Sequence, residues 1–495
     1  ACGLLGFQPN LPVVSLFPAF HYSFHTPFQN VRLKQGHIMQ AQEIKRQLQA
    51  FLSDAEIIEA DDAFLLDQRR RYRGRADWVV QPASVENVQH VMRFCFEHGI
   101  AVTPQGGNTG LCGAAVPDGG LLLSLSRLNR IRSISLADNA ITVDAGAVLQ
   151  NVQQAAAEAG RLFPLSLASE GSCQIGGNIA CNAGGLNVLR YGTMRDLVLG
   201  LEVVLPNGEL ISHLPPLHKN TTGYDLRHLF IGSEGTLGII TGASLKLFAQ
   251  PQTTETAWVG VARISQAVEL LTLMQTEFAE RLCSFELVSR FALDLSADFS
   301  KIAGPVDAPW HVLLELTDSV ARDDLGDLLA EFLVTHGFDN AVLAQSESER
   351  QNLWTLRENI SASQRNLGAS IKHDIAVPIE RVAEFVERCA PALQTAFAGI
   401  QIVVFGHLGD GSLHYNTFLP GVLGNEVYQY EDAVNTIVYE NVLACAGTIA
   451  AEHGIGQVKN QWLPRVRSEA EIALMRAIKA ELDPGNLLNA NKLLP

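Results

Sequence analysis

Two histidines in the second half of the sequence have the spacing of a pair of metal ligands. His407 and His414 flank Asp410-Gly411, a dipeptide typical of a two-residue β-hairpin loop. Such a loop would place the two imidazoles opposite one another with their Cβ atoms about 5 Å apart, close enough to bind one ion. Asn416, two residues further along, would lie on the same face. Two histidines hydrogen-bonded within a half-buried hairpin are the alternative that this segment alone leaves open.

A second segment, Ala451-Glu452-His453-Gly454, adds a carboxylate and a third imidazole. Neighbouring side chains point in different directions, so one can bind the ion while the other faces a substrate. We therefore predict Glu452 as the third ligand and His453 as a general base. Two histidines and one carboxylate with an open coordination position suit Zn²⁺, with Mn²⁺ as the second choice. The ion would lower the pKa of a substrate hydroxyl group, whose proton His453 would remove.

Glycine-rich loops in the first half of the sequence could bind an anionic cofactor. The first loop, 104–113, follows a predicted strand, and its glycines allow backbone amides to point at one anion such as a pyrophosphate. It lacks the Gly-Lys-Ser/Thr of a P-loop, and the strand expected after it does not fit a Rossmann turn, which leads into a helix. A simple glycine-rich turn remains the alternative for this loop alone.

Two further loops favour a long ligand that lies against the backbone. They cover 171–178 with 182–185, and 232–240. Three such loops on strand ends within one domain fit FAD better than a mononucleotide. The residues assigned to the cofactor are Pro104, Gly106, Gly107, Asn108, Thr109, Gly110, Gly113, Gly171, Ser172, Gly176, Gly177, Asn178, Asn182, Gly184, Gly185, Glu234, Gly235 and Ile240.

Alternating strands and helices must position these loops. We expect strands at 78–80, 100–103, 121–125, 141–144, 199–205 and 209–212, a helix that starts after Ser84 and ends before Gly99, and a helix at 149–159. Asn207-Gly208 predicts a hairpin between the last two strands. The composition changes near residue 250. Beyond it, strands at 257–262, 282–288, 311–317 and 340–344 with helices at 264–281 and 322–336 have the order of a ferredoxin-like unit.

The predicted fold is therefore α+β with several domains, as the length of 495 residues requires. We expect an extension at 1–38, a helical segment at 39–74, a cofactor domain at 75–251, an antiparallel substrate and metal domain at 252–450, and a C-terminal segment at 451–495 that returns to the cofactor. Residues 1–38 carry Arg32 and Lys34 as their only formal charges, and they are neither Arg-rich nor amphipathic, which argues against a transit peptide.

Composition excludes several classes of function. The net charge of -16 argues against nucleic acid as a partner, because no large basic patch remains to contact phosphates. Every apolar run falls short of the roughly 18 residues that cross a bilayer, so a membrane contact would be peripheral. The eight cysteines include no Cys-x-x-Cys, so neither an iron–sulfur cluster nor a thiolate zinc site is indicated, and free thiols in a reducing compartment are expected.

The three loops, together with Asn220-Thr221-Thr222-Gly223-Tyr224-Asp225-Leu226, resemble the FAD-binding domain of the vanillyl-alcohol oxidase superfamily. More narrowly, the sequence resembles the branch that contains D-2-hydroxyglutarate dehydrogenase, D-lactate dehydrogenase and the glycolate oxidase flavoprotein subunit. The resemblance runs from about residue 75 to the C-terminus. It implies a vanillyl-alcohol oxidase-type fold with a ferredoxin-like cap. It also implies non-covalent FAD, since the first loop has no histidine for flavin attachment.

The resemblance also assigns residues to roles. His407, His414 and Glu452 match the metal ligands of the family, and His453 matches its base, which acts while the C2 hydride passes to the flavin. Arg357, Ser361 and Lys372 fall where the 2-hydroxyglutarate branch holds its substrate, with Ser361 in place of a more usual threonine, and Asn416 joins them. Asn489 falls on a flavin contact, although Asn489-Ala490-Asn491-Lys492 stands where Asn-Pro-Gly-Lys is usual.

The expected reaction is oxidation of D-2-hydroxyglutarate to 2-oxoglutarate, with a quinone or an electron-transfer flavoprotein as acceptor. The alternatives are the same chemistry on D-lactate or glycolate, a metallohydrolase whose glycine loops are only turns, and a non-catalytic flavoprotein subunit. We expect a homodimer as the assembly to test. The expected location is the cytoplasm, with or without a peripheral membrane contact, or the mitochondrion for a eukaryotic source.

Overall fold

The computed structural model describes residues 39–495, so the predicted extension 1–38 lies outside the described residues. The described part begins with helix α1 (Ala41–Leu48), which buries Ile44 and Leu48. The indole of Trp78 donates a hydrogen bond to the carbonyl of Ala41 at 2.7 Å. Glu56, in the next turn, accepts hydrogen bonds from Ser53, Ala83 and Asn87. These contacts fix the N-terminal segment on the first sheet.

The first sheet has four strands in the order β1-β2-β4-β3. Their bounds are β1 (Ile57–Ile58), β2 (Trp78–Val80), β4 (Leu121–Ser124) and β3 (Val102–Gln105). β4 runs parallel to β2 and β3, and helix α3 (Val85–His98) connects β2 to β3. As predicted, the helix starts after Ser84, which caps it, and ends at Gly99, which adopts φ 66°.

The second sheet has five antiparallel strands in the order β5-β6-β10-β8-β9. They are β5 (Ile131–Ser135), β6 (Ala140–Asp144), β10 (Ile239–Lys246), β8 (Val198–Val204) and β9 (Leu210–His213). The predicted hairpin at Asn207-Gly208 is confirmed, with Val204 paired to Leu210. Shorter elements complete this part: α2 (Asp62–Leu65), α4 (Leu149–Glu158), β7 (Arg161–Leu162), α5 (Ile175–Ala180), α6 (Val188–Tyr191), α7 (Met194–Leu197), α8 (Arg227–Phe230) and β11 (Phe248–Ala249).

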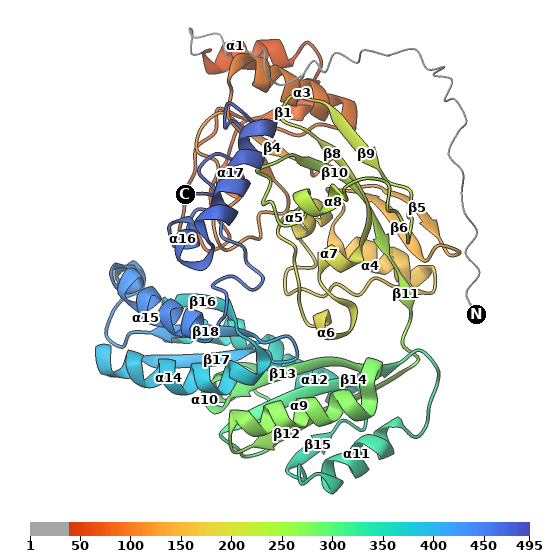
Figure 1. Cartoon of the computed structure of the whole chain (residues 1–495), viewed down its shortest axis with the longest axis vertical. Coiled ribbons are helices and arrows are strands. Elements are labelled where there is room, and N and C mark those ends of the chain that lie inside the picture. Colours follow the sequence, from red (N-terminus) through yellow and green to blue (C-terminus); the bar gives the residue numbers. More distant parts are fainter. Residues whose placement is uncertain (1–38) are drawn as a thin grey trace, which may run out of the picture. The chain divides into compact units, whose positions relative to one another are not determined.

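The third sheet has seven strands in the order β15-β12-β14-β13-β17-β18-β16 (Figure 1). They are β12 (Thr253–Val261), β13 (Leu282–Ser289), β14 (Trp310–Asp318), β15 (Ala341–Leu343), β16 (Ile371–Ala376), β17 (Gln401–His407) and β18 (Ser412–Phe418). The first four strands, with α9 (Ile264–Phe278) and α11 (Leu325–Thr335), have the predicted ferredoxin-like order. Helix α10 (Arg290–Ser300) interrupts this unit and was not predicted.

Helices cover both faces of the seven-stranded sheet. The helices α9, α11, α14 (Val382–Ala396) and α15 (Glu431–Ala444) pack in one hydrophobic core with the sheet. On the opposite face, α10 and α12 (Glu347–Glu358) pack around Trp258, Phe405 and neighbouring apolar side chains. α12 is followed by α13 (Ile360–Ser363). The polar residues of the site therefore emerge from strands that are otherwise apolar on both faces.

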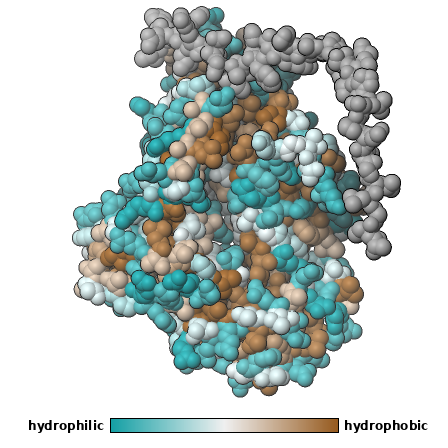
Figure 2. Space-filling model, viewed as in Figure 1, coloured by the Kyte–Doolittle hydropathy of each residue, from teal (hydrophilic) through white to brown (hydrophobic). Residues whose placement is uncertain are grey.

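The C-terminal segment returns to the first sheet. After α16 (Leu463–Val466) and α17 (Glu469–Leu482), Leu488 forms an isolated parallel bridge with Val102. On the face shown in Figure 2, hydrophilic residues are interspersed with hydrophobic ones. None of the helices within residues 39–495 combines the length and the apolar character that a membrane span requires.

Candidate active site

The β17–β18 hairpin carries the two histidines with a register that differs from the predicted one. His414 pairs with Phe405, not with His407, and the chain turns through 408–411 instead of a two-residue loop. The reason is that β17 also pairs with β13. His407 lies opposite Glu286 on β13, and the amide of Gly409 donates to the carbonyl of Phe285 at 3.0 Å. The slip is two residues, so both imidazoles still share one face.

The three predicted metal ligands converge at the end of this hairpin. The ring centroids of His407 and His414 are 6.1 Å apart. Nε2 of His407 lies 3.4 Å from Oε1 of Glu452. Each of the three residues offers one ligand atom, and these atoms all lie within 4.8 Å of one another. Two imidazole nitrogens and one carboxylate at this separation fit a divalent transition metal with open coordination positions.

The charges around the triad differ between its members. Burial opposes the charge on His407, yet Glu286 and Glu452 raise its pKa well above the usual value. Burial lowers the pKa of His414 to about 4. For Glu452, burial favours the neutral acid, but His407 and His414 together hold its pKa below the usual range. A neutral His414 with a carboxylate beside it is ready to bind a cation without first losing a proton.

His453 lies beside the triad and is oriented by Asp374. The rings of His414 and His453 stack with centroids 5.7 Å apart. Asp374 on β16 accepts hydrogen bonds from the amides of Glu452 and His453, and its Oδ2 lies 3.6 Å from Nδ1 of His453. Burial would favour its neutral form, but His453, Lys459 and His414 hold the pKa of Asp374 well below the usual range. Asp374 therefore fixes both the loop and the ring of the predicted base.

Glu286 links His407 to Arg357. Its Oε1 accepts a hydrogen bond from Nδ1 of His407 at 2.7 Å. Its Oε2 lies 2.8 Å from Nε and 2.6 Å from Nη2 of Arg357. These contacts use two of the five guanidinium N–H groups of Arg357, so the two on Nη1 and the second on Nη2 are left for the substrate role predicted for this residue. The fully buried Glu286 has its pKa lowered to about 2, since His407 and Arg357 outweigh the effect of burial.

Sequence reasoning missed Glu286 and Asp374. Each is the single acidic residue of a strand that is buried at most of its positions, β13 (LCSFELVS) and β16 (IKHDIA). A buried carboxylate is costly unless it is paired, so an isolated acidic residue in such a strand is a signal that could have identified both.

The remaining predicted substrate residues lie on or near the same face. Lys372 pairs with Asn416 across β16 and β18, one step beyond the pair formed by Asp374 and His414. The Asn416 side chain is buried and donates to Gln364 at 2.9 Å. Ser361, on α13, is exposed, and its hydroxyl makes no hydrogen bond within residues 39–495. The structure thus brings Lys372 and Asn416 to the triad, while Ser361 lies at the solvent-exposed side of α13.

The three glycine loops pack against one another. A Cβ atom at Gly107 would overlap the carbonyl oxygen of Ser172, so the first and second loops touch at backbone level. A Cβ at Gly235 would lie 2.6 Å from Pro104, which joins the third loop to the first. The second loop was predicted to lie on a strand end. It instead runs directly into helix α5. The first amides of this helix donate outside it, that of Ile175 to the carbonyl of Ala147 and that of Gly176 to the carbonyl of Ala145.

Several side chains assigned to the cofactor are engaged with protein. Asn108 donates to the carbonyls of Ala63 and Leu66. Asn182 accepts the amide of Arg195. Glu234 accepts the amides of Ile455 and Gly456, both at 2.7 Å, and burial raises its pKa. These three side chains shape the loops, and only their backbones remain to face a ligand.

Two buried amide oxygens within residues 39–495 have no partner at this junction, Oε1 of Gln174 and Oδ1 of Asn489. Asn489 donates to the carbonyl of Glu234 at 2.7 Å, which places its free oxygen beside the third loop. Gln174 lies next to Gly106 of the first loop. Glycine backbones in close contact and unpartnered amide oxygens fit a long polar ligand such as FAD.

The flavin loops and the metal ligands adjoin one another. A Cβ at Gly184, in the second loop region, would lie 3.5 Å from Oε1 of Glu452. A Cβ at Gly456 would overlap the carbonyl of Cys112 in the first loop. The segment that carries Glu452 and His453 therefore passes directly along the cofactor loops, and the two predicted sites form one continuous site.

Comparison with known proteins agrees with this geometry. Residues 76–213 match the FAD binding domain model, and residues 250–493 match the model of the C-terminal domain of FAD linked oxidases. The chain is 34% identical to the mitochondrial D-2-hydroxyglutarate dehydrogenase of Danio rerio over 451 residues, which covers 90% of this chain and 83% of that protein. It is 38% identical to D-2-hydroxyglutarate dehydrogenase of Xanthomonas citri pv. viticola, covering 86% of this chain and 91% of that protein.

Solved structures show the same fold at low identity. p-Cresol methylhydroxylase superposes with a TM-score of 0.72 at 17% identity, covering 91% of this chain and 96% of that chain. Alkyldihydroxyacetonephosphate synthase superposes with a TM-score of 0.71 at 16% identity, covering 94% and 88%. The vanillyl-alcohol oxidase-type fold that the family resemblance implied is thereby confirmed. The chain belongs to the family of FAD-linked oxidases that includes the D-2-hydroxyglutarate dehydrogenases, and it is an FAD-dependent oxidoreductase.

Proposed function

We propose that this enzyme oxidises a D-2-hydroxy acid to the 2-oxo acid, with D-2-hydroxyglutarate as the substrate, non-covalent FAD and one divalent metal ion. The observation that carries the proposal is the convergence of His407, His414 and Glu452, whose ligand atoms lie within 4.8 Å of one another beside the cofactor loops. The names of the relatives from Danio rerio and Xanthomonas citri support the choice of substrate.

The residues of the chain divide the chemistry between them. His407, His414 and Glu452 would hold Zn²⁺, with Mn²⁺ as the alternative, and Glu286 leaves Nε2 of His407 as the ligand atom by accepting from Nδ1. A bound ion would act as a Lewis acid on the substrate oxygens, and bound FAD would accept a hydride. His453 would take the hydroxyl proton, held in place by the carboxylate of Asp374. Lys372 and Asn416 would position the substrate from the neighbouring strands.

The proposal also covers the electron acceptor, the assembly and the cellular location of the enzyme. We infer a quinone or an electron-transfer flavoprotein as acceptor and a homodimer as the assembly. The relatives from Danio rerio and Bos taurus are named as mitochondrial. For this chain we propose the mitochondrion if its source is eukaryotic and the cytoplasm otherwise.

The test is anaerobic reduction of the bound flavin by a panel of D and L 2-hydroxy acids. We expect D-2-hydroxyglutarate to bleach the visible flavin absorbance faster than D-lactate or glycolate, and the L enantiomer to leave it unchanged. Faster reduction by D-lactate would assign the chain to the alternative substrate. Absence of reduction by every 2-hydroxy acid would contradict the proposed reaction.

A further inference from the structure

Three cations without an acidic partner lie beyond the metal ligands. Lys372 is on β16, and Arg69 is in the segment that precedes β2. The exposed Arg365 follows Gln364, whose Oε1 accepts a hydrogen bond from Asn416, the cross-strand partner of Lys372. Within residues 39–495, none of the three forms an ion pair with a carboxylate. Arg71, two residues after Arg69, by contrast pairs with Glu431 through two hydrogen bonds.

The loop that carries Arg69 holds this residue near the start of β16. The carboxylate of Asp67 accepts the backbone amides of residues 69, 71 and 72, which fixes the backbone at this point. Nη2 of Arg69 lies 3.5 Å from the carbonyl of Ser370 and 3.5 Å from the hydroxyl of Tyr428. Ser370 is two residues before Lys372, so the guanidinium reaches the end of β16 at which Lys372 lies. Both hydrogen bonds are long, and the group keeps donors available for a better acceptor.

The position of Lys372 relates this cation group to the triad. Lys372 and Asn416 form the next cross-strand pair on the same face as Asp374 and His414, two residues away, and two residues along a strand advance about 6.7 Å. That step is comparable with the length of a short dicarboxylic acid. Burial lowers the pKa of Lys372 to about 8, and the positive charges of Arg69 and Arg365 act in the same direction. In a chain of net charge -16, this local excess of positive charge lacks its counter-ion.

We propose that Arg69 and Arg365 complete, around Lys372, a subsite for the distal carboxylate of the substrate, so that the enzyme selects 2-hydroxy dicarboxylic acids over monocarboxylic ones. This inference rests on the proposed function and deepens it. It adds a contribution from the N-terminal segment to a substrate site whose other predicted members all lie beyond residue 356. It also supplies cations without an acidic partner, whereas the charge of Arg357 is paired with that of Glu286.

The experiment compares Arg69→Gln, Arg365→Gln and the double variant with Arg73→Gln. Arg73 is the matched control, because it is an exposed arginine of the same segment that pairs with Asp62 at the surface. For each protein, KM and kcat are measured with D-2-hydroxyglutarate and with D-2-hydroxybutyrate, which has no distal carboxylate. Calorimetric binding of 2-oxoglutarate and of 2-oxobutyrate gives a second readout that does not depend on turnover.

Loss of one charge-assisted hydrogen bond corresponds to about a tenfold change in affinity, so we expect KM for D-2-hydroxyglutarate to rise ~10-fold in each single variant and more in the double variant. KM for D-2-hydroxybutyrate should stay within about twofold, as should all constants of Arg73→Gln. Arg69→Lys should recover part of the loss, which a misfolded protein would not do.

Two results would separate the subsite from the proposed function. If D-2-hydroxyglutarate reduces the flavin but Arg69→Gln and Arg365→Gln leave both KM values unchanged, or raise them equally, the distal subsite is wrong and the reaction stands. If no 2-hydroxy acid reduces the flavin in the wild-type protein, the proposed function is wrong. In that case, unaltered binding of 2-oxoglutarate to Arg69→Gln would overturn the subsite as well.

Discussion

Glu286 is fully buried, and its two carboxylate oxygens serve two different residues of the site. Oε1 accepts from His407 and Oε2 accepts from Arg357. A histidine that ligates a metal through Nε2 needs its Nδ1 proton held by such a partner, because this fixes the tautomer and the direction of the ring. A single buried carboxylate thus holds both a predicted metal ligand, His407, and a positively charged side chain, Arg357.

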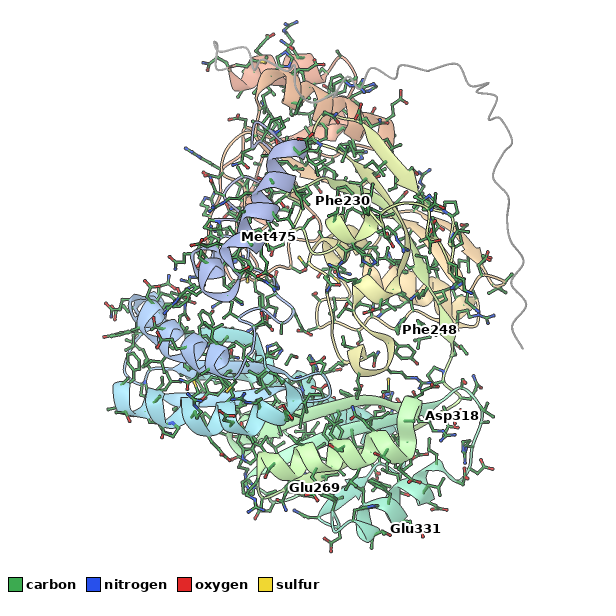
Figure 3. All side chains as sticks on the ribbon, in the orientation of Figure 1. Phe230, Phe248, Glu269, Asp318, Glu331 and Met475 are labelled. Atoms are coloured by element: carbon green, nitrogen blue, oxygen red, sulfur yellow. The ribbon has the colours of Figure 1, made fainter. Side chains whose placement is uncertain are left out.

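We expect Glu286→Gln to weaken metal binding by about 10–100-fold, the usual effect of losing a carboxylate behind a histidine ligand. The amide retains the shape but loses the charge that His407 and Arg357 require. Metal content after dialysis against a weak chelator measures the effect. Glu269→Gln on α9 is the control, since Glu269 is an exposed carboxylate of the same part of the chain (Figure 3). Unchanged metal content in Glu286→Gln would contradict this role.

Lys372 gives a prediction of pH dependence. Its pKa is lowered to about 8 by burial and by the neighbouring arginines, so below pH 8 the free enzyme carries the charge that a substrate carboxylate requires. Because kcat/KM reports the free enzyme, it should fall as the pH rises through about 8. Lys372→Arg keeps its charge at all these pH values, so its profile should remain flat in this range. An identical alkaline limb in both proteins would assign the titration to another group.

At the scale of elements, the three glycine loops have to approach one another at backbone distance. The loops touch at Gly107 and Ser172 and at Gly235 and Pro104. No side chain fits at these contacts, which is why the glycines cluster there. The assembly of loops, rather than any one of them, therefore forms the cradle for a long cofactor.

Gly107→Ala should therefore lose FAD, because its Cβ would overlap the backbone of Ser172 and push two loops apart. We expect a purified protein with a much lower ratio of flavin to protein absorbance than the wild type. Gly304→Ala is the control, because this exposed glycine lies outside the three loops and a Cβ there would meet only the side chain of Leu293, at 3.3 Å. Full flavin content in Gly107→Ala would show that the loops can yield.

The sequence predicted more of the elements than of their pairing. The Ser84 and Gly99 caps and the Asn207-Gly208 turn are local signals, and these elements form as expected. The His407–His414 register was wrong because it depends on β13, a strand more than a hundred residues away, which competes for the end of β17. Glu286 and Asp374 were missed for the same reason, since strand order in the third sheet is not a local property of the chain.

At the scale of the whole molecule, the metal ligands and the cofactor loops come from different sheets. His407 and His414 belong to the seven-stranded sheet, whereas the first glycine loop starts at the end of β3 in the first sheet and the third leads into β10 in the second. The only ligand near the loops is Glu452, whose segment is held by Asp374 and Glu234 through backbone hydrogen bonds that need no ion. The fold around the flavin should therefore persist when the metal is removed.

Chelation of the metal should abolish turnover and leave the flavin bound. Flavin absorbance of the protein after gel filtration measures whether the flavin stays bound. Loss of activity on chelation, and its recovery on adding Zn²⁺ or Mn²⁺, measures the dependence of turnover on the metal. His414→Ala should behave as the chelated enzyme does, with no recovery on adding metal. Release of FAD on chelation would instead indicate that the ion has a structural role.

The bridge between Val102 and Leu488 also determines when the enzyme can first work. Strand β3 is made early in translation. The amide and carbonyl groups of Val102, however, form hydrogen bonds with Leu487 and Asn489, which are synthesised almost four hundred residues later. A nascent chain still attached to the ribosome at residue 480 has this edge open and lacks Asn489. Capture of the flavin therefore follows synthesis of that segment, and ribosome-bound fragments that end before it should be colourless.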